Sequence, residues 1–508
     1  MPPRLVVGIK IDGLQQSHLN KLENYLSSNG LKRFISEGAV VENMRHNILS
    51  AGSAADVATM LSGTVPYYHG VSGNDYFDRN SREIVPILRD ENQVGIGTKQ
   101  KLSAHNLLTS TLVDELVMVS PQSKTYSIAI QPEDAIMMGG HTADYVCWID
   151  PSQLKWVTTA YYTKGLTRWA DEMNASGKFQ EIASKSWRPN ISMSNYLNPS
   201  ASGSRTAEFQ YNPLERKKTN SAETILCNTP AANNLVSELA QTVFNREGLG
   251  EDKFTDMLLL QFTVKTPKET TSALQTAEKE DMYLRLDKEI QNLISYITSK
   301  TGTENVLFYL VGSPGDLHSP LELGSNKIPA GYFNADRSIA LINTYLMALY
   351  GQEKWMEGYY GKNLFLNRRR IEEKKLNFQE IQNRVAEFLL EFEGIQAAFP
   401  VNQIINYSGN DVDERLKLRN SYHKKTSGDI VITLLPGWVE VNDKNQVVGE
   451  ANTPVKYVPF YLYGWKIKHK VINTACQTVD ITPTLCRILN ISYPNACIGK
   501  PIGELIGE

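Results

Sequence analysis

The sequence lacks the features that mark membrane, disulfide-rich and zinc-finger proteins. Its longest apolar runs, such as Leu5–Ile11 and Met257–Phe262, fall far short of the roughly 20 residues that a membrane-spanning helix needs. The five cysteines are odd in number, widely spread and free of CxxC pairs, so they predict neither a disulfide framework nor a zinc finger. Because no leader-like segment follows Met1, we expect a cytoplasmic protein without membrane insertion.

The sequence also lacks an excess of either positive or negative charge. Lys and Arg total 52 against 55 Asp and Glu, which gives a formal net charge of −3. A chain this balanced has no strong overall field for nucleic acid, so we expect no nucleic-acid partner. Hydrophobic residues make up 41% and charged residues 21%, which is typical of a folded globular chain. The 508 residues suffice for about three domains, or for one large α/β domain with insertions.

What the sequence does contain is a series of buried strands separated by helical patterns. The first apolar strand ends at Asp12, the position where functional residues of α/β proteins gather. The later elements form a β-α-β unit, which predicts a right-handed crossover and a parallel sheet. The expected elements are strands at Leu5–Ile11, Met257–Val264, Asn305–Val311 and Tyr457–Tyr463, a helix over Tyr283–Ile297 and a terminal helix from Asp480.

Two stretches interrupt this pattern. Residues 184–223 are rich in Ser, Asn, Pro and Arg, which predicts a loop-rich insertion. Residues 316–428 look more helical: Asn377 is a typical N-cap, and the apolar face that follows it runs to Phe392 and ends at Gly394. We expect one domain over residues 1–508, with a core of 1–183, 224–315 and 429–508, a loop-rich insertion at 184–223 and a mostly helical insertion at 316–428.

Common single motifs of hydrolases are absent: there is no HExxH, no GxSxG and no intact Walker A. The informative segment is Ser53–Asp75, which opens on Ser-Ala-Ala-Asp, passes through Ser-Gly-Thr-Val-Pro and ends in His-Gly and Gly-Asn-Asp. It resembles the nucleophile segment of the alkaline phosphatase superfamily, in the branch of phosphate-irrepressible alkaline phosphatases and nucleotide pyrophosphatase/phosphodiesterases. Further matches follow in order at Gly139–His141, Trp148–Asp150, Tyr283–Asp287, Ser427–Ile430, Val458–Pro459, Asp480–Thr484 and Gly499–Pro501.

The resemblance implies an alkaline-phosphatase-like α/β fold, with a mostly parallel central sheet flanked by helices. It also implies a centre in which two zinc ions activate a Thr or Ser hydroxyl and hold the phosphoryl group. Matched residue by residue, the carboxylate at the end of the first strand falls on Asp12 and the nucleophile on Ser53. The Asn that helps to hold the phosphate falls on Asn74.

The remaining matched positions do not carry the residues that this chemistry needs. The Lys and Arg that contact phosphate fall on Gln131 and Glu133. The zinc-ligand positions besides Asp12 fall on Thr266, Thr270, Ser313, Pro314 and Val448. Each zinc takes about four N, O or S ligands, and one carboxylate cannot balance two divalent ions. We therefore expect no cofactor.

These departures favour a pseudoenzyme that keeps the fold and binds a small phosphorylated ligand or a protein partner. A second hypothesis is a metal-dependent phosphatase or phosphodiesterase that recruits zinc through displaced ligands such as Asp12, Asp56, Asp316 and His318. A third is an assembly subunit with no small-molecule role, for which an exposed apolar patch or a tight oligomer would be evidence.

Several of these residues also have structural interpretations. Ser53 with Asp56 three residues later fits a helix N-cap, and Asp12 fits a turn after the strand. His69 and His141 lie in motifs of the family without being ligands there, so we expect both to make structural hydrogen bonds.

Overall fold

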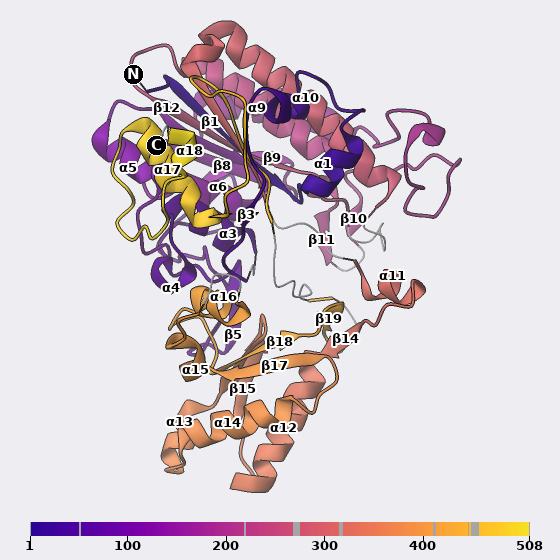
Figure 1. Cartoon of the computed structure of the whole chain (residues 1–508), viewed down its shortest axis with the longest axis vertical. Helices are drawn as coiled ribbons and strands as arrows, with labels where there is room; N and C mark the ends of the chain where they lie inside the picture. Colours follow the sequence, from indigo (N-terminus) through magenta and orange to yellow (C-terminus); the bar gives the residue numbers. More distant parts are fainter. Residues whose placement is uncertain are drawn as a thin grey trace.

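The computed structural model describes residues 2–49, 52–217, 220–267, 275–313, 318–409, 413–444, 447–448 and 457–506, with the backbone alone for residues 216–217 and 220–224. Within these residues, a ten-stranded sheet forms the centre of the larger part of the molecule (Figure 1). In spatial order its strands are β21 (Lys470–Ile472), β2 (Ala39–Val41), β20 (Phe460–Gly464), β13 (Val306–Gly312), β1 (Leu5–Asp12), β12 (Asp256–Thr263), β7 (Thr125–Ala129), β8 (Tyr145–Asp150), β9 (Lys155–Thr159) and β6 (Gly95–Ile96).

The middle of this sheet is parallel, as predicted. Strand β1 lies between β13 and β12, and it is parallel to both. Strands β7 and β8 continue the parallel order, whereas β20 and β9 run antiparallel at the two sides. Parallel strands need crossover helices, and the long helix between β12 and β13 supplies one of them. The expected α/β fold is therefore confirmed.

Alternate residues of β1 face opposite layers of helices. Leu5, Val7, Ile9 and Ile11 belong to the core on one face, and Val6 belongs to the core on the other. The first face is covered by α1 (Gln16–Leu22), α2 (Leu31–Ser36), α7 (Arg168–Ala175), α8 (Lys178–Ser184), α9 (Pro230–Arg246) and α10 (Ala277–Thr301). The second is covered by α3 (Ser53–Ser62), α5 (Leu112–Val119), α6 (Pro132–Gly139) and α17 (Ile481–Leu489), with the short α18 (Gly503–Ile506) on α17.

A second, smaller sheet lies at the opposite end of the molecule from α9 and α10 (Figure 1). Its antiparallel strands are, in order, β15 (Met356–Tyr360), β16 (Asn363–Leu366), β18 (Ile430–Leu434) and β17 (Ile395–Pro400). Nearby, β14 (Gly331–Asn334) pairs with β19 (Trp438–Val441). The helices of this part are α11 (Pro320–Ser325), α12 (Ala335–Tyr350), α13 (Arg368–Glu373), α14 (Phe378–Leu389), α15 (Val401–Ile405) and α16 (Glu414–Ser421).

Helices α11 to α16 make up most of the regular structure in the insertion at 316–428. It also contains strands, of which β16 and β17 pair with β18, and β14 pairs with β19, both from beyond residue 428. These strands are only four to six residues long, too short for a clear period-two pattern. The N-cap at Asn377 is confirmed, because its side chain accepts a hydrogen bond from the Glu380 amide (3.2 Å). The helix ends at Leu389, however, and Gly394 turns the chain into β17 with a φ of +89°.

A hairpin of the large part ties the insertion to it. Strands β4 (Asp75–Asp78) and β5 (Glu83–Pro86) pair with each other, and the intervening Arg79 donates a hydrogen bond to the fully buried Asp429 (2.8 Å). Arg368 donates to the other oxygen of Asp429 through Nε (2.8 Å). Two guanidinium groups on one buried carboxylate make this a strong junction, because charge-assisted hydrogen bonds are stronger than neutral ones.

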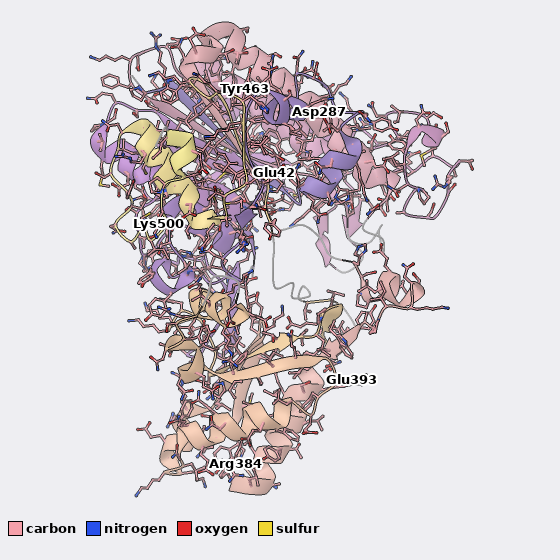
Figure 2. The ribbon with its side chains drawn as sticks, viewed as in Figure 1. Glu42, Asp287, Arg384, Glu393, Tyr463 and Lys500 are labelled. Atoms are coloured by element: carbon pink, nitrogen blue, oxygen red, sulfur yellow. The ribbon has the colours of Figure 1, made fainter. Side chains whose placement is uncertain are left out.

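The remaining segments are short. The expected loop-rich stretch at 184–223 contains one turn of 3-10 helix and the hairpin strands β10 (Arg216–Lys217) and β11 (Asn220–Thr224). Other short elements are β3 (Met44–Arg45), β22 (Cys476–Gln477) and α4 (Pro66–His69). Figure 2 shows Lys500 beside the large sheet and Arg384, on α14, at the far end of the insertion. No helix in the described part of the chain has both the length and the apolar character to cross a membrane.

Candidate functional site

Four polar side chains meet where β1 ends. Lys10 and Asp12 are two residues apart on β1, so both side chains leave the sheet on the face that α3 and α6 cover. Ser53 is the first residue of α3, and Asp134 lies in the first turn of α6. Since α3 and α6 pack against each other on this face, they bring Ser53 and Asp134 to the same point. We call Lys10, Asp12, Ser53 and Asp134 the Lys10 cluster.

The Lys10 ammonium holds the cluster together. Its Nζ donates hydrogen bonds to Asp12 Oδ1 (2.5 Å), to Ser53 Oγ (2.7 Å) and to Asp134 Oδ1. An ammonium group has three protons to donate, so this set uses all of them. Lys10 is 3% exposed and Asp134 is fully buried. A buried lysine is tolerated only when its charge is paired in this way.

The Ser53 hydroxyl is engaged on both sides. Its Oγ accepts from Lys10 and donates to Asp134 Oδ1 (2.6 Å). This arrangement corrects the N-cap interpretation of Ser53, because the cap position is Gly52, with a φ of +132°, and the hydroxyl makes no capping bond. Asn74 caps instead: its Oδ1 accepts from the Ala54 amide (2.9 Å). A Cβ on Gly52 would lie 2.4 Å from that oxygen, so glycine is needed there.

The charges of the cluster shift the pKa values of its members. Burial alone lowers the pKa of Lys10, but the neighbouring carboxylates Asp12 and Asp134 outweigh it and hold that pKa above its ordinary value. The pKa of Asp12 is lowered, because Lys10 and Lys265 together outweigh the effect of its burial. Burial and the negative charge of Asp12 raise the pKa of Asp134. Lys10 and Asp12 are therefore both charged at neutral pH.

Further polar groups surround Asp12. Gln261, which lies opposite Lys10 on β12, donates from Nε2 to Asp12 Oδ2 (3.2 Å). Ser313, just after β13, accepts from the Gly13 amide (3.1 Å) and also hydrogen-bonds to Asp12. A Cβ placed on Gly13 would lie 3.7 Å from Lys279 Nζ and 3.1 Å from Lys265 Cγ, so two more lysines reach this end of β1.

The positions that the resemblance gives for zinc ligands are only partly described. Thr266 follows β12 and Ser313 follows β13, at the same edge of the sheet as Asp12. Val448 is exposed, and Thr270 and Pro314 lie outside the described residues. Within the residues that the structure describes, no three or more His, Cys, Asp or Glu side chains form a group that could hold a metal ion.

The proposed displaced ligands have other partners. Asp56 pairs with His46 Nε2 (3.0 Å), and His318 Nδ1 pairs with Glu322 (2.9 Å). Asp316 lies outside the described residues. The groups around Asp12 are hydroxyls and an amide besides the Asp12 and Asp134 carboxylates, and three lysines approach them. This donor set does not fit two zinc ions, which need anionic or imidazole ligands.

The two histidines make hydrogen bonds within the fold. His69 is fully buried; its Nδ1 accepts from the Val71 amide (3.1 Å) and its Nε2 lies 3.0 Å from Thr59 Oγ1. Burial and the neighbouring His423 lower the pKa of His69 to about 3, so it stays neutral. His141 contacts the Tyr161 hydroxyl (3.0 Å) and the Thr109 carbonyl (3.1 Å).

A pocket of about 390 Å³ adjoins the cluster. It is lined by Asp75, Pro86, Leu88, Arg89, Glu91, Lys99, Gln100, Lys101, Leu102, Pro132 and Glu133. Asp75 follows Asn74 in the chain, and Glu133 precedes Asp134, so the pocket and the cluster share the first turn of α6. Gln131 occupies the N-cap position of α6, where its side chain makes no capping hydrogen bond.

The pocket is lined by both acidic and basic side chains. Arg89 and Lys101 both bind Glu91, at 2.6 Å and 3.1 Å, which neutralises much of their charge. Among the acidic residues, burial raises the pKa of Glu133 to about 7. Burial also raises the pKa of Asp75, although Tyr360 donates a hydrogen bond to it (3.2 Å). Neither Asp75 nor Glu133 has an ion pair among the described residues.

The sequence analysis missed Lys10 and Asp134. A signal for Lys10 existed: it is a charged residue in a strand that is otherwise apolar, and a buried lysine requires a carboxylate nearby. Asp134 gave no such signal, because it is 124 residues away in the chain and only the packing of α6 brings it to Lys10.

Comparison with known proteins agrees with this architecture. The profile of the type I phosphodiesterase / nucleotide pyrophosphatase family matches residues 6–456. The chain belongs to this family. Alkaline phosphatase PafA of Elizabethkingia meningoseptica is 25% identical over 100% of this chain and 95% of its own length. Alkaline phosphatase PhoV of Synechococcus elongatus is 26% identical over 99% of this chain and 93% of its own length. The resemblance to the alkaline phosphatase superfamily is therefore confirmed.

A solved structure shares the whole fold. The crystal structure of wild type alkaline phosphatase PafA superposes with a TM-score of 0.89 at 24% identity, covering 100% of this chain and 99% of that one. The insertion and the large sheet therefore belong to one known fold.

Proposed function

We propose that this protein is a catalytically degenerate member of its family, which binds a small ligand and does not hydrolyse phosphate esters. The observation that carries the proposal is the state of the Ser53 hydroxyl, held between Lys10 and Asp134. A serine nucleophile needs a base or a metal ion to take its proton. Its side-chain partners here are the Lys10 ammonium, whose raised pKa excludes it as that base, and the Asp134 carboxylate, which is already paired with that same ammonium.

The metal chemistry of the family does not fit the residues around Asp12. The resemblance gives that chemistry two zinc ions, and the matching positions other than Asp12 hold hydroxyl or apolar side chains. Hydrolysis of phosphate monoesters requires among the largest known rate enhancements. A serine without a metal ion does not supply it. Loss of zinc binding is thus part of the proposal.

The pocket beside the cluster supports a binding role. The positions that the resemblance gives to phosphate-contacting Lys and Arg are Gln131 and Glu133, so a phosphate dianion would meet a carboxylate there. The same pocket is also lined by Lys99, Arg89 and Lys101. A ligand with an amine and an acidic group matches this mixed lining better than a plain phosphate ester. We therefore propose a small zwitterionic ligand.

A turnover assay tests the loss of catalysis. Purified protein is incubated with p-nitrophenyl phosphate and bis-p-nitrophenyl phosphate, with and without added zinc, beside the Ser53→Ala variant. We expect no difference between the wild-type and variant chains. Turnover that needs Ser53 would overturn the proposal and restore the metal-dependent hydrolase as the better hypothesis.

A binding assay tests the ligand class. Thermal shift and calorimetry compare inorganic phosphate, p-nitrophenyl phosphate and phosphoethanolamine, which carries both an amine and a phosphate. We expect phosphoethanolamine to stabilise the wild-type protein more than phosphate does, and Glu133→Gln to remove that preference. Equal responses in both proteins would refute the zwitterion, and no response to any of the three would favour a protein partner.

A further inference from the structure

The Lys10 ammonium lies where three oxygen acceptors from three separate elements converge. These acceptors are Asp12 Oδ1 of β1, Ser53 Oγ of α3 and Asp134 Oδ1 of α6. A point enclosed by two carboxylate oxygens and a hydroxyl oxygen is typical of a bound cation. In this chain the cation is part of the polypeptide.

We infer that Lys10 is a built-in replacement for a metal ion, which holds β1, α3 and α6 together at the centre. This inference deepens the proposed function, because it names what occupies the centre of a non-catalytic member. The ammonium supplies a single positive charge and three donors, which satisfy the oxygens that a metal ion would otherwise coordinate. It does so without any exchange with solvent, since Lys10 is 3% exposed.

The surroundings of Lys10 fit this role. Its stem lies in a strand whose neighbouring positions are fully buried, so the methylenes pack as an apolar side chain and only the tip is polar. Gln261, opposite it on β12, donates to the second oxygen of Asp12 and fixes that carboxylate. The second oxygen of Asp134, Oδ2, is buried without a hydrogen-bond partner among the described residues. Asp134 therefore depends on Lys10 and Ser53 for its pairing.

The alternative is a catalytic serine-lysine pair, and the geometry argues against it. A lysine that serves as the base must give up its proton, yet the two carboxylates that flank Nζ favour the protonated form. The same two carboxylates are what a metal ion would require. The contacts thus point to a structural cation.

Chemical rescue tests the inference. The Lys10→Ala variant removes three methylenes and the ammonium, which together have the size of propylammonium. We expect the variant to unfold at a temperature lower than wild type by about 5 °C or more, and millimolar propylammonium to restore at least half of the loss. 1-Propanol, which has the same length without the charge, is the matched ligand control.

A second buried lysine is the matched protein control. Lys417 of α16 is 4% exposed and lies in the insertion, so Lys417→Ala leaves the Lys10 cluster unchanged. We expect propylammonium to leave the melting temperature of Lys417→Ala unaffected. Recovery in Lys10→Ala alone supports the inference, whereas no recovery, or equal recovery in both variants or with 1-propanol, overturns it.

Two further measurements keep the inference testable if Lys10→Ala does not fold. Zinc or manganese titrated into Lys10→Met, which keeps the volume of the side chain, is expected to raise its melting temperature more than that of wild type.

Reductive methylation of the wild-type protein, followed by mass spectrometry of its peptides, is expected to modify Lys10 at least tenfold more slowly than the exposed Lys21. Methylation at similar rates would show that Nζ is not enclosed and would refute the inference. These readouts do not involve phosphate turnover. They can therefore fail while the proposed function stands, and the proposed function can fail while they succeed.

Discussion

Two adjacent residues of one helix turn, Glu133 and Asp134, have opposite surroundings. Asp134 is fully buried and bonded to Lys10 and Ser53. Glu133 lines the neighbouring pocket and has no ion pair in the described part of the chain. Successive residues at the start of a helix point in directions about 100° apart, so one turn serves both places. In the Lys10 cluster both carboxylates are paired with an ammonium within the fold, whereas the pocket keeps a carboxylate without an ion pair in the described part of the chain.

This difference separates side chains that stabilise the fold from side chains that are available to a ligand. A closed group of paired charges contributes to folding and leaves nothing for a ligand. An unpaired carboxylate in a pocket costs stability, and proteins retain such groups where binding or chemistry uses them. Removal of a charge from the Lys10 cluster should therefore destabilise the protein, whereas removal of the Glu133 charge from the pocket should stabilise it.

The largest effect is expected from Lys10→Met. Removal of one partner from a buried ion pair leaves the other charge uncompensated, which costs about 3–5 kcal/mol. Urea unfolding at neutral pH measures the loss. The double variant Lys10→Met/Asp134→Asn should lose less than the two single variants added together, because the cluster acts as a unit. Additive losses would mean that Lys10 and Asp134 do not interact.

The next effect is the pH dependence that Glu133 causes. Its folded pKa of about 7 exceeds the ordinary value of 4.5, so between these values the folded protein holds more protons than the unfolded chain. Stability must then fall as the pH rises from about 4.5 to about 7, by up to about 3 kcal/mol and by less where solvent screens the carboxylate. Unfolding of wild type and Glu133→Gln at pH 5 and pH 8 measures it. A variant with the same fall as wild type would exclude Glu133 as its source.

The sequence predicted the centre of the fold better than its periphery. Leu5–Ile11 and Met257–Val264 are nearly continuous apolar runs, which is the pattern typical of parallel strands buried on both faces. The strands at 356–366 are only four and five residues long, so the adjacent helical periodicity obscured them. For the site, motif positions led to Ser53 and Asn74. Their actual contacts with Lys10, Asp134 and Ala54 arise from tertiary packing, which no local pattern encodes.

A smaller effect is expected from Ser53→Ala. The substitution removes one acceptor and one donor from the cluster, but it leaves Lys10 paired with both carboxylates, so the cost should be about 1 kcal/mol. Ser62→Ala on the same helix is the matched control, since that buried hydroxyl only returns a bond to the Ala58 carbonyl. Its effect should be smaller. If Ser53→Ala cost as much as Lys10→Met, the serine and not the lysine would hold the cluster together.

The smallest effect is expected from metal removal, and it bears most directly on the comparison. If the ammonium of Lys10 supplies the cation of the centre, the wild-type protein has no metal ion to lose there. EDTA should then leave its melting temperature unchanged, and mass spectrometry of protein purified in zinc-containing, chelator-free buffer should find close to no zinc per chain. The control is Lys10→Met, whose two carboxylates stay in place, and a zinc-dependent rise in its melting temperature should vanish with EDTA. About two zinc ions per wild-type chain would instead mean that residues outside the Lys10 cluster complete a metal site, and that the protein is a phosphatase after all.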